Sequence, residues 1–329
     1  MLLLPGIFVW KAYRQEQLDC ALLIAIKHNA TKTAVSLLAA GADANAKDLP
    51  TGSRVMWQRL WDRLRGKRPP TKTAQSALLL AVEGLPGTGV AHENVPLIKA
   101  LLDKGADVNA RDEGRMTPLL AAVVNQHPVT VRLLLDHGAN VNIKDNGSDT
   151  LSDNLDGTGK PLGTWHHPGL TALQHADDLD NLEMMRLLLE HGADANVRLP
   201  YGNTLLIQAA GSGDSDKIRL LLPHGAKVDA TDSDGSTALM HLARSAYTGT
   251  MLLLLKQGAD VNARDHEGET ALMYSTDGVE DDPATLQLLL KWGADAHLKN
   301  RAGKTALSIA QDGNRFKSIH FLIQSGMKE

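Results

Sequence analysis

A short glycine-centred motif recurs down this chain at a nearly constant step, and this spacing restricts the possible folds more than any other feature. The motif is Gly-Ala-Asp or a close variant. Its copies, the last of them degenerate, begin at Gly41, Gly105, Gly138, Gly192, Gly225, Gly258, Gly293 and Gly326. Four of the intervals are 33 residues, a period typical of a helical solenoid. A solenoid buries its core by stacking copies and exposes one long surface, so binding is expected rather than catalysis.

The copy at residues 232–258 shows how one repeat should fold. Asp232 and Gly235 are expected to form a turn, because Asp bonds its own backbone and Gly accepts a positive φ. Thr237 is placed to cap a first helix, and Gly258 follows a second helix where a left-handed C-cap is needed. Each helix is about 8–10 residues, too short to persist alone in water. The unit must therefore stack on its neighbours.

The residue expected at each first-helix start recurs from copy to copy, and it is Cys20, Ser76, Thr117, Thr171, Thr204, Thr237, Thr270 or Thr305. The best-matching stretches are residues 117–122 (TPLLAA), 258–265 (GADVNARD) and 265–272 (DHEGETAL). Over residues 17–326 the chain resembles the ankyrin-repeat family, although the usual Pro after Thr survives only at Pro118. The resemblance implies an all-α solenoid of about eight helix-turn-helix repeats with protruding turns.

Two long intervals and an apolar start divide the chain further. We expect a lead-in over residues 1–16 and a single repeat domain over 17–329, with insertions at about 49–73 and 146–168. The first ten residues are apolar, about half of what a membrane-spanning helix needs, and lack the features of a signal peptide. They are interpreted as a hydrophobic cap on the first repeat or as the remnant of an anchor.

The first insertion combines an amphipathic helix pattern with positive charge. Residues 53–72 carry a net charge of +6, which leaves −10 for the rest of the chain. Two interpretations stay open: contact with an anionic membrane or an acidic partner, or a helix laid back on the repeats with its Trp side chains inward. Nucleic acid is not expected as a partner, because the patch is small and the rest of the chain is acidic. The residues that define this feature are Arg54, Trp57, Arg59, Trp61, Arg63 and Arg65.

No metal or cofactor site is expected. The second insertion carries Asp149, Asp153 and Asp156 but misses the calcium-loop spacing, and its histidines have no zinc spacing; a polar exposed loop is predicted. The single Cys20 excludes an intrachain disulfide and is read as a small buried residue. Three histidines, His137, His191 and His224, precede the motif glycine and are expected to meet the last carbonyls of a helix.

Catalysis is not expected either. The chain has no phosphate-binding glycine loop ending in Lys-Ser/Thr and no nucleophile elbow. The acid pairs Asp177/Asp178 and Asp281/Asp282 lie at or near expected turns and are predicted to be solvated. We therefore predict that the protein is not an enzyme.

The resemblance implies that a partner docks on the turn tips and on the concave inner-helix face. We predict a cytoplasmic, monomeric scaffold that binds a protein with a basic patch facing repeats six and seven. The alternative is an adaptor held at a membrane by the N-terminal segment or by the Trp57/Trp61 helix. The predicted partner-binding residues are Glu113, Met116, Tyr201, Asn203, Asp234, Arg244, His266, Glu267, Glu269, Arg301 and Lys304.

Overall fold

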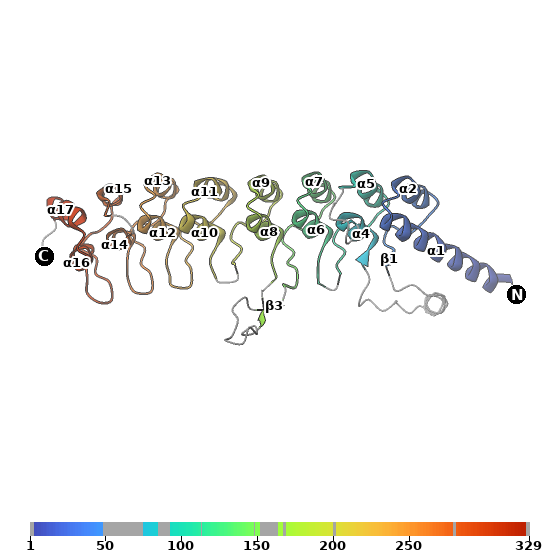
Figure 1. Cartoon of the computed structure of the whole chain (residues 1–329), viewed down its shortest axis with the longest axis horizontal. Coiled ribbons are helices and arrows are strands. Elements are labelled where there is room, and N and C mark those ends of the chain that lie inside the picture. Colours follow the sequence, from blue (N-terminus) through green and yellow to red (C-terminus); the bar gives the residue numbers. More distant parts are fainter. Residues whose placement is uncertain are drawn as a thin grey trace. The chain divides into compact units, whose positions relative to one another are not determined.

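The chain folds into stacked pairs of short helices, as a computed structural model shows (Figure 1). The structure describes residues 3–48, 75–84, 93–112, 114–147, 149–151, 164–166, 169–199, 202–278 and 281–326. It divides into two compact units, an N-terminal unit (Met1–Ala193) and a C-terminal unit (Asp194–Glu329). The prediction of an all-α repeat solenoid is confirmed, while the division at residue 16 and the single domain over 17–329 stay predictions.

The N-terminal unit has an inner layer of helices, from whose starts the turns extend, and an outer layer that covers it. The inner helices are α1 (Leu3–Lys27), α4 (Ala77–Glu83), α6 (Pro118–Val124) and α8 (Ala172–Asp178). The outer helices are α2 (Thr31–Ala39), α5 (Val95–Asp103), α7 (Pro128–Asp136) and α9 (Leu182–Glu190). Each inner helix packs on its own outer helix, and α1, α4 and α6 each pack on the next inner helix along the chain.

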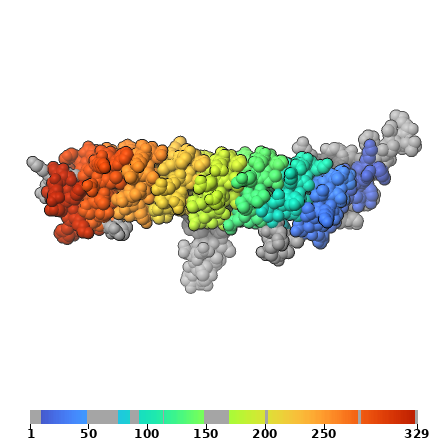
Figure 2. All heavy atoms as spheres, turned by 90° about the horizontal axis from the view of Figure 1, so that it is seen from above, coloured from blue at the N-terminus to red at the C-terminus, as the bar shows by residue number. Residues whose placement is uncertain are grey.

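The C-terminal unit repeats this arrangement. Its inner helices are α10 (Leu205–Ser212), α12 (Ala238–Arg244), α14 (Ala271–Thr276) and α16 (Ala306–Asp312). Its outer helices are α11 (Ser215–Leu221), followed by the 3₁₀ turn η1 (Leu222–His224), α13 (Thr248–Lys256), α15 (Pro283–Lys291) and α17 (Phe316–Gln324). Within this unit the colours run in order from yellow to red, so each pair lies next to its neighbours in sequence (Figure 2).

Small residues let the inner helices approach one another. Ala122, Ala176 and Ala310 occupy the same repeat position and have no exposed surface. Leucines of the outer helices, such as Leu134 and Leu254, are equally buried, and each contributes about 1.5–3 kcal/mol by leaving water. The thin core explains why a chain with 4% aromatic residues can fold.

Both predicted insertions begin and end in short antiparallel ladders at the turn tips. β1 (Lys47–Asp48) pairs with β2 (Gln75–Ser76), and β3 (Asp149–Leu151) pairs with β4 (Thr164–His166). The ends of the second insertion are therefore strands where a loop was predicted, and their Thr, Leu and Trp residues suit a pleated ribbon. The rest of both insertions, including Arg54, Trp57, Arg59, Trp61, Arg63 and Arg65, lies outside the described residues.

An asparagine ladder joins successive helix pairs, and the sequence analysis did not anticipate it. The amide of Asn196 donates to the carbonyl of Gly225 (2.9 Å), while its oxygen accepts from the backbone N–H of Lys227 (2.8 Å). Asn262 makes the same two bonds to Gly293 (3.0 Å) and Asp295 (2.8 Å). One side chain thus satisfies a donor and an acceptor of the next repeat.

The ladder also runs through the N-terminal unit, where Asn45 bonds the carbonyl of Gly105 (2.9 Å) and the N–H of Asp107 (2.7 Å). In the C-terminal unit, Asp229 takes the place of asparagine. Its carboxylate accepts from the N–H of Asp260 (3.0 Å) but has no N–H to donate. This repeat junction therefore lacks one hydrogen bond that the asparagine junctions have.

Two side chains of α1 reproduce the ladder at the first repeat. The amide of Gln15 donates to the carbonyl of Gly41 (3.0 Å), and the carboxylate of Asp19 accepts from the N–H of Asp43 (2.8 Å). The prediction that Cys20 starts a helix was wrong, because α1 runs through it without a turn, and Cys20 is only partly buried. In the described part of the chain, no helix has the length and apolar character needed to cross a membrane.

Candidate functional site

The inner helices begin at the predicted hydroxyl residues. The hydroxyls of Ser76, Thr117, Thr204 and Thr305 each accept from the backbone N–H three residues later, at 3.2–3.3 Å. Thr171 forms a reciprocal capping box with Gln174, a motif that satisfies two backbone donors. These caps fix where each turn ends and each inner helix starts.

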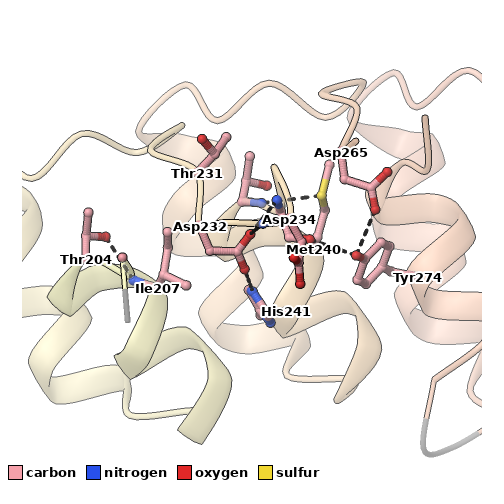
Figure 3. Close-up of polar contacts among 12 residues, drawn as sticks. Thr204, Ile207, Thr231, Asp232, Asp234, Met240, His241, Asp265 and Tyr274 are labelled. Carbon is pink, nitrogen blue, oxygen red and sulfur yellow. Dashed lines mark hydrogen bonds and ion pairs between the residues drawn. The ribbon is translucent and has the colours of Figure 1, made fainter. Parts of the chain in front are cut away.

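Thr237 and Thr270 are the N-cap residues of α12 and α14, so Thr237 stands at the predicted helix start. Both hydroxyl oxygens are nevertheless buried without a hydrogen-bond partner in the described structure, so the predicted bond from the Thr237 hydroxyl is not made. The backbone N–H of Thr237 donates instead to the sulfur of Met240 at 3.4 Å (Figure 3). Buried polar atoms left unsatisfied cost stability, so these two inner-helix starts are less well capped than those at Thr204 and Thr305.

The predicted turn at Asp232 and Gly235 is confirmed. One oxygen of Asp232 accepts from the backbone N–H groups of Asp234 (2.9 Å) and Ser236 (2.8 Å). Gly235 has φ +83°, and a Cβ there would lie 2.9 Å from the backbone nitrogen of His266. Only glycine combines this left-handed backbone with so close an approach of the next tip.

At two tips of the C-terminal unit, the fourth residue of the following inner helix hydrogen-bonds the aspartate that forms the turn. The second oxygen of Asp232 bonds the ring Nε2 of His241 (2.8 Å), and the second oxygen of Asp265 accepts from the Tyr274 hydroxyl (2.9 Å) (Figure 3). In the N-terminal unit His175 holds Asp145 in the same way at 2.7 Å. This role was not predicted from the sequence, although His175, His241 and Tyr274 all follow the helix-start Thr at a fixed offset of four.

Burial and hydrogen bonding set the ionisation of these tips. Burial raises the pKa of the Asp232 carboxyl, but hydrogen bonds from His241, Ser236 and Asp234 together hold it below its usual value. The same balance, with His175, Gly147 and Leu170 as donors, lowers the pKa of Asp145. Burial, with the nearby Asp265 and Glu269 charges, raises the pKa of Tyr274 to about 12 against the lowering effect of Ser236. Tyr274 therefore remains a protonated donor at neutral pH.

Successive tips of the C-terminal unit are also bonded to each other. The N–H of His266 donates to the carbonyl of Asp234 (2.9 Å), and the N–H of Arg301 donates to the carbonyl of Glu267 (2.8 Å). The Tyr274 hydroxyl reaches back to Ser236 at 2.8 Å. The three tips at residues 232–236, 265–269 and 300–304, hereafter the tip ridge, thus form a connected edge.

The tip ridge carries most of the predicted binding residues. Asp234, His266 and Glu267 are exposed on the first two tips. Arg301 is exposed on the third, and its guanidinium lies 3.8 Å from the carboxylate of Glu267. Glu269 is half-buried because its carboxylate accepts from the amide of Asn300 at 3.0 Å. Glu269 therefore supports the tip and is a weaker candidate for partner contact than its neighbours.

Ion pairs extend from the ridge onto the inner-helix ends. Lys304 pairs with Asp312 at 2.8 Å, which raises the pKa of the lysine, and Arg244 lies 3.7 Å from Asp277. An open hollow of about 510 Å³ lies between the last two tips and these helix ends. Its lining comprises Glu267, Glu269, Asp277, Asn300, Ala302, Lys304, Ile309, Asp312 and Gly313.

The remaining predicted contact residues do not belong to the three tips of the ridge. Met116 belongs to the N-terminal unit and is partly exposed, while its N–H donates to Asp112 at 2.8 Å. Asn203 is partly exposed, and its carbonyl accepts from the N–H of Leu199. Glu113 and Tyr201 lie outside the described residues.

Of the four acids predicted to be solvated, Asp178 is exposed, whereas the other three are buried or partly buried. Asp177 is buried because it lies on the packed face of α8. Asp282 caps α15, and Asp281 accepts from the first N–H groups of α17 at Lys317 and Ser318. Burial raises the pKa of Asp281, but the bonds from Ser318 and Lys317 and the Arg315 charge hold it below its usual value. The carboxylate of Asp281 thus links the segment before α15 to the start of α17.

The prediction for the three recurring histidines is confirmed. The ring Nδ1 atoms of His137, His191 and His224 lie 2.8 Å from the carbonyls of Leu133, Leu187 and Leu220. Across the described residues, no group of three or more His, Cys, Asp or Glu side chains is arranged to hold a metal ion. The buried polar side chains of the tips hold the turns in place by hydrogen bonds, and the exposed ones form a charged edge.

Comparison with known proteins gives a family match. A sequence model described as ankyrin repeats (3 copies) matches five overlapping segments: residues 64–145, 88–198, 146–232, 173–265 and 206–300. Together these matches span residues 64–300, well over half of the chain. No curated protein matches the chain significantly.

Proposed function

Because this chain belongs to the ankyrin-repeat family, whose repeats generally mediate protein–protein interaction, we propose that it is a scaffold that binds a partner through the tip ridge of its C-terminal unit. The observation that carries the proposal is the fixed edge formed by Asp234, His266 and Glu267, whose backbones are bonded tip to tip while their side chains stay exposed. A preorganised edge lowers the ordering cost of association.

The charge of the ridge suggests the kind of partner. Asp234 and Glu267 present carboxylates to solvent, and Asp277 adds a third at the end of α14. Arg301 reverses the sign at the last tip. A partner with a basic patch over the first two tips and an acid near the third would match this order, since complementary charge fixes register and speeds encounter.

Two further features of the proposal come from the sequence. With a single cysteine, the chain suits a reducing compartment such as the cytoplasm. We place the scaffold there as a monomer, since the ridge needs no second copy of this chain to be complete.

The proposal is tested by reversing the two exposed tip acids. Asp234→Lys/Glu267→Lys leaves Glu269 and its bond to Asn300 intact, so the tips keep their support. The matched control is Glu183→Lys/Glu190→Lys, which makes the same charge change at exposed positions of the outer helix α9.

Each protein would serve as bait in native lysate, with quantitative mass spectrometry of the captured proteins and circular dichroism as a fold check. We expect a basic protein that wild type and the outer-helix control capture equally and the tip variant loses by tenfold or more, about 1.4 kcal/mol. Equal capture by all three baits would refute the proposed surface.

A further inference from the structure

Helix α1 continues far beyond the part that packs. It has 25 residues, whereas the other inner helices of the described structure have between six and eight. Among residues 10–27, the buried apolar residues are Leu22, Leu23, Ala25 and Ile26, all near the C-terminal end of the helix. The N-terminal half extends away from α2 and α4 (Figure 1), so packing of the first repeat does not account for it.

An exposed apolar stripe, interrupted by the exposed Gln17, follows the outward side of this helix. Trp10 is 59%, Tyr13 40% and Ile24 55% exposed. The spacings of three and fourteen residues correspond to about one and four helical turns, which places the three side chains on one face. Exposed single hydrophobic residues are ordinary, but an aligned set that includes Trp and Tyr indicates a binding face.

The charges beside the stripe have one sign. The two acids of α1 are buried, since Glu16 is 7% and Asp19 is 4% exposed. The Asp19 carboxylate accepts hydrogen bonds from the amide of Gln15 and from the backbone N–H of Asp43. The exposed charged residues from Trp10 to Lys27 are Lys11, Arg14 and Lys27. Lys27 pairs with Asp48 at 2.7 Å, and the Arg14 guanidinium lies 5.7 Å from the centre of the Trp10 ring.

We propose that this outward face of α1 binds an anionic membrane surface, with Trp10 and Tyr13 at headgroup depth and Lys11 and Arg14 against lipid phosphates. Indole and phenol rings favour the interface, where one end is apolar and the other wet. A basic amphipathic helix binds there in the plane of the membrane. An acidic protein would match Lys11 and Arg14, but it gives no reason for residues 3–10 of the same helix to lack any charge.

The test is flotation of the full chain with phosphatidylserine/phosphatidylcholine vesicles and with phosphatidylcholine vesicles alone. Wild type should float with the anionic vesicles, and added salt should release it. Lys11→Glu/Arg14→Glu should weaken binding at least 25-fold, since each surface cation contributes about fivefold. Trp10→Ala should weaken it about tenfold. None of these residues contributes to the packed core, so thermal unfolding should be unchanged.

Two control variants make the result decisive. Phe316→Ala/Ile323→Ala removes exposed apolar residues from α17 and should leave flotation unchanged. The tip variant Asp234→Lys/Glu267→Lys should also float as wild type does, which separates this face from the partner surface. Flotation that is equal with neutral vesicles, absent altogether, unaffected by the α1 variants, or abolished by Trp57→Ala/Trp61→Ala alone would overturn the proposal.

Discussion

Removal of the Asn262 side chain tests whether the asparagine ladder couples the repeats. Asn262→Ala deletes two hydrogen bonds, to the carbonyl of Gly293 (3.0 Å) and from the N–H of Asp295 (2.8 Å). Each neutral bond contributes about 0.5–1.5 kcal/mol net, and water can replace part of both because Asn262 is only partly buried. We expect a loss of about 1–2 kcal/mol in the free energy of unfolding, and about half of that for Asn262→Asp, which keeps the acceptor.

The junction at Asp229, where an aspartate replaces the ladder asparagine, allows the opposite experiment. Asp229→Asn restores a donor toward the carbonyl of Gly258 and should stabilise the chain by about 0.5–1 kcal/mol. Glu183→Gln removes the same charge at an exposed site and is the control. Urea denaturation would measure all four variants, with the slope checked because stacked repeats need not unfold as one unit. The reasoning fails if Asp229→Asn does not exceed its control, or if Asn262→Asp loses as much as Asn262→Ala.

Two further predictions concern the locked tips. Tyr274→Phe removes the donor to the Asp265 carboxylate and the contact with Ser236. We therefore expect the free energy of unfolding, measured by chemical denaturation, to fall by about 1.5–3 kcal/mol. A fall of less than about 0.5 kcal/mol would show that these two hydrogen bonds do not stabilise the chain. The pKa of Asp232 is lower in the folded than in the unfolded chain, so its contribution is complete above the unfolded value of about 3.9 and disappears as pH falls through the folded value. The stability difference between wild type and Asp232→Asn should therefore shrink below about pH 4, and a constant difference would contradict the assigned hydrogen bonds.

Features that recur at the same position of successive repeats were predictable from the sequence. The 33-residue period gave the helix pairs, and the recurrence of His137, His191 and His224 at one position identified their bond to the helix end. A turn at Asp232 followed from local chemistry alone. Such features depend on residues a few positions apart, where backbone preference is strong.

Features that depend on stacking were not predictable in this way. The Ser236–Tyr274 contact joins residues 38 apart, and the ladder joins residues about 30 apart. The misreading of Cys20 arose because the repeat period was extended into a segment where α1 replaces the turn. The bond from Asn300 to Glu269 was not predictable either, because it forms only between neighbouring repeats.

Docking of a protein partner on the tip ridge is tested most directly by amide hydrogen exchange of this chain with and without the captured partner. We expect slower exchange in the complex at residues 232–236, 265–269 and 300–304, with the outer helices α11, α13 and α15 unchanged. Protection confined to the outer helices or to the N-terminal unit would contradict it.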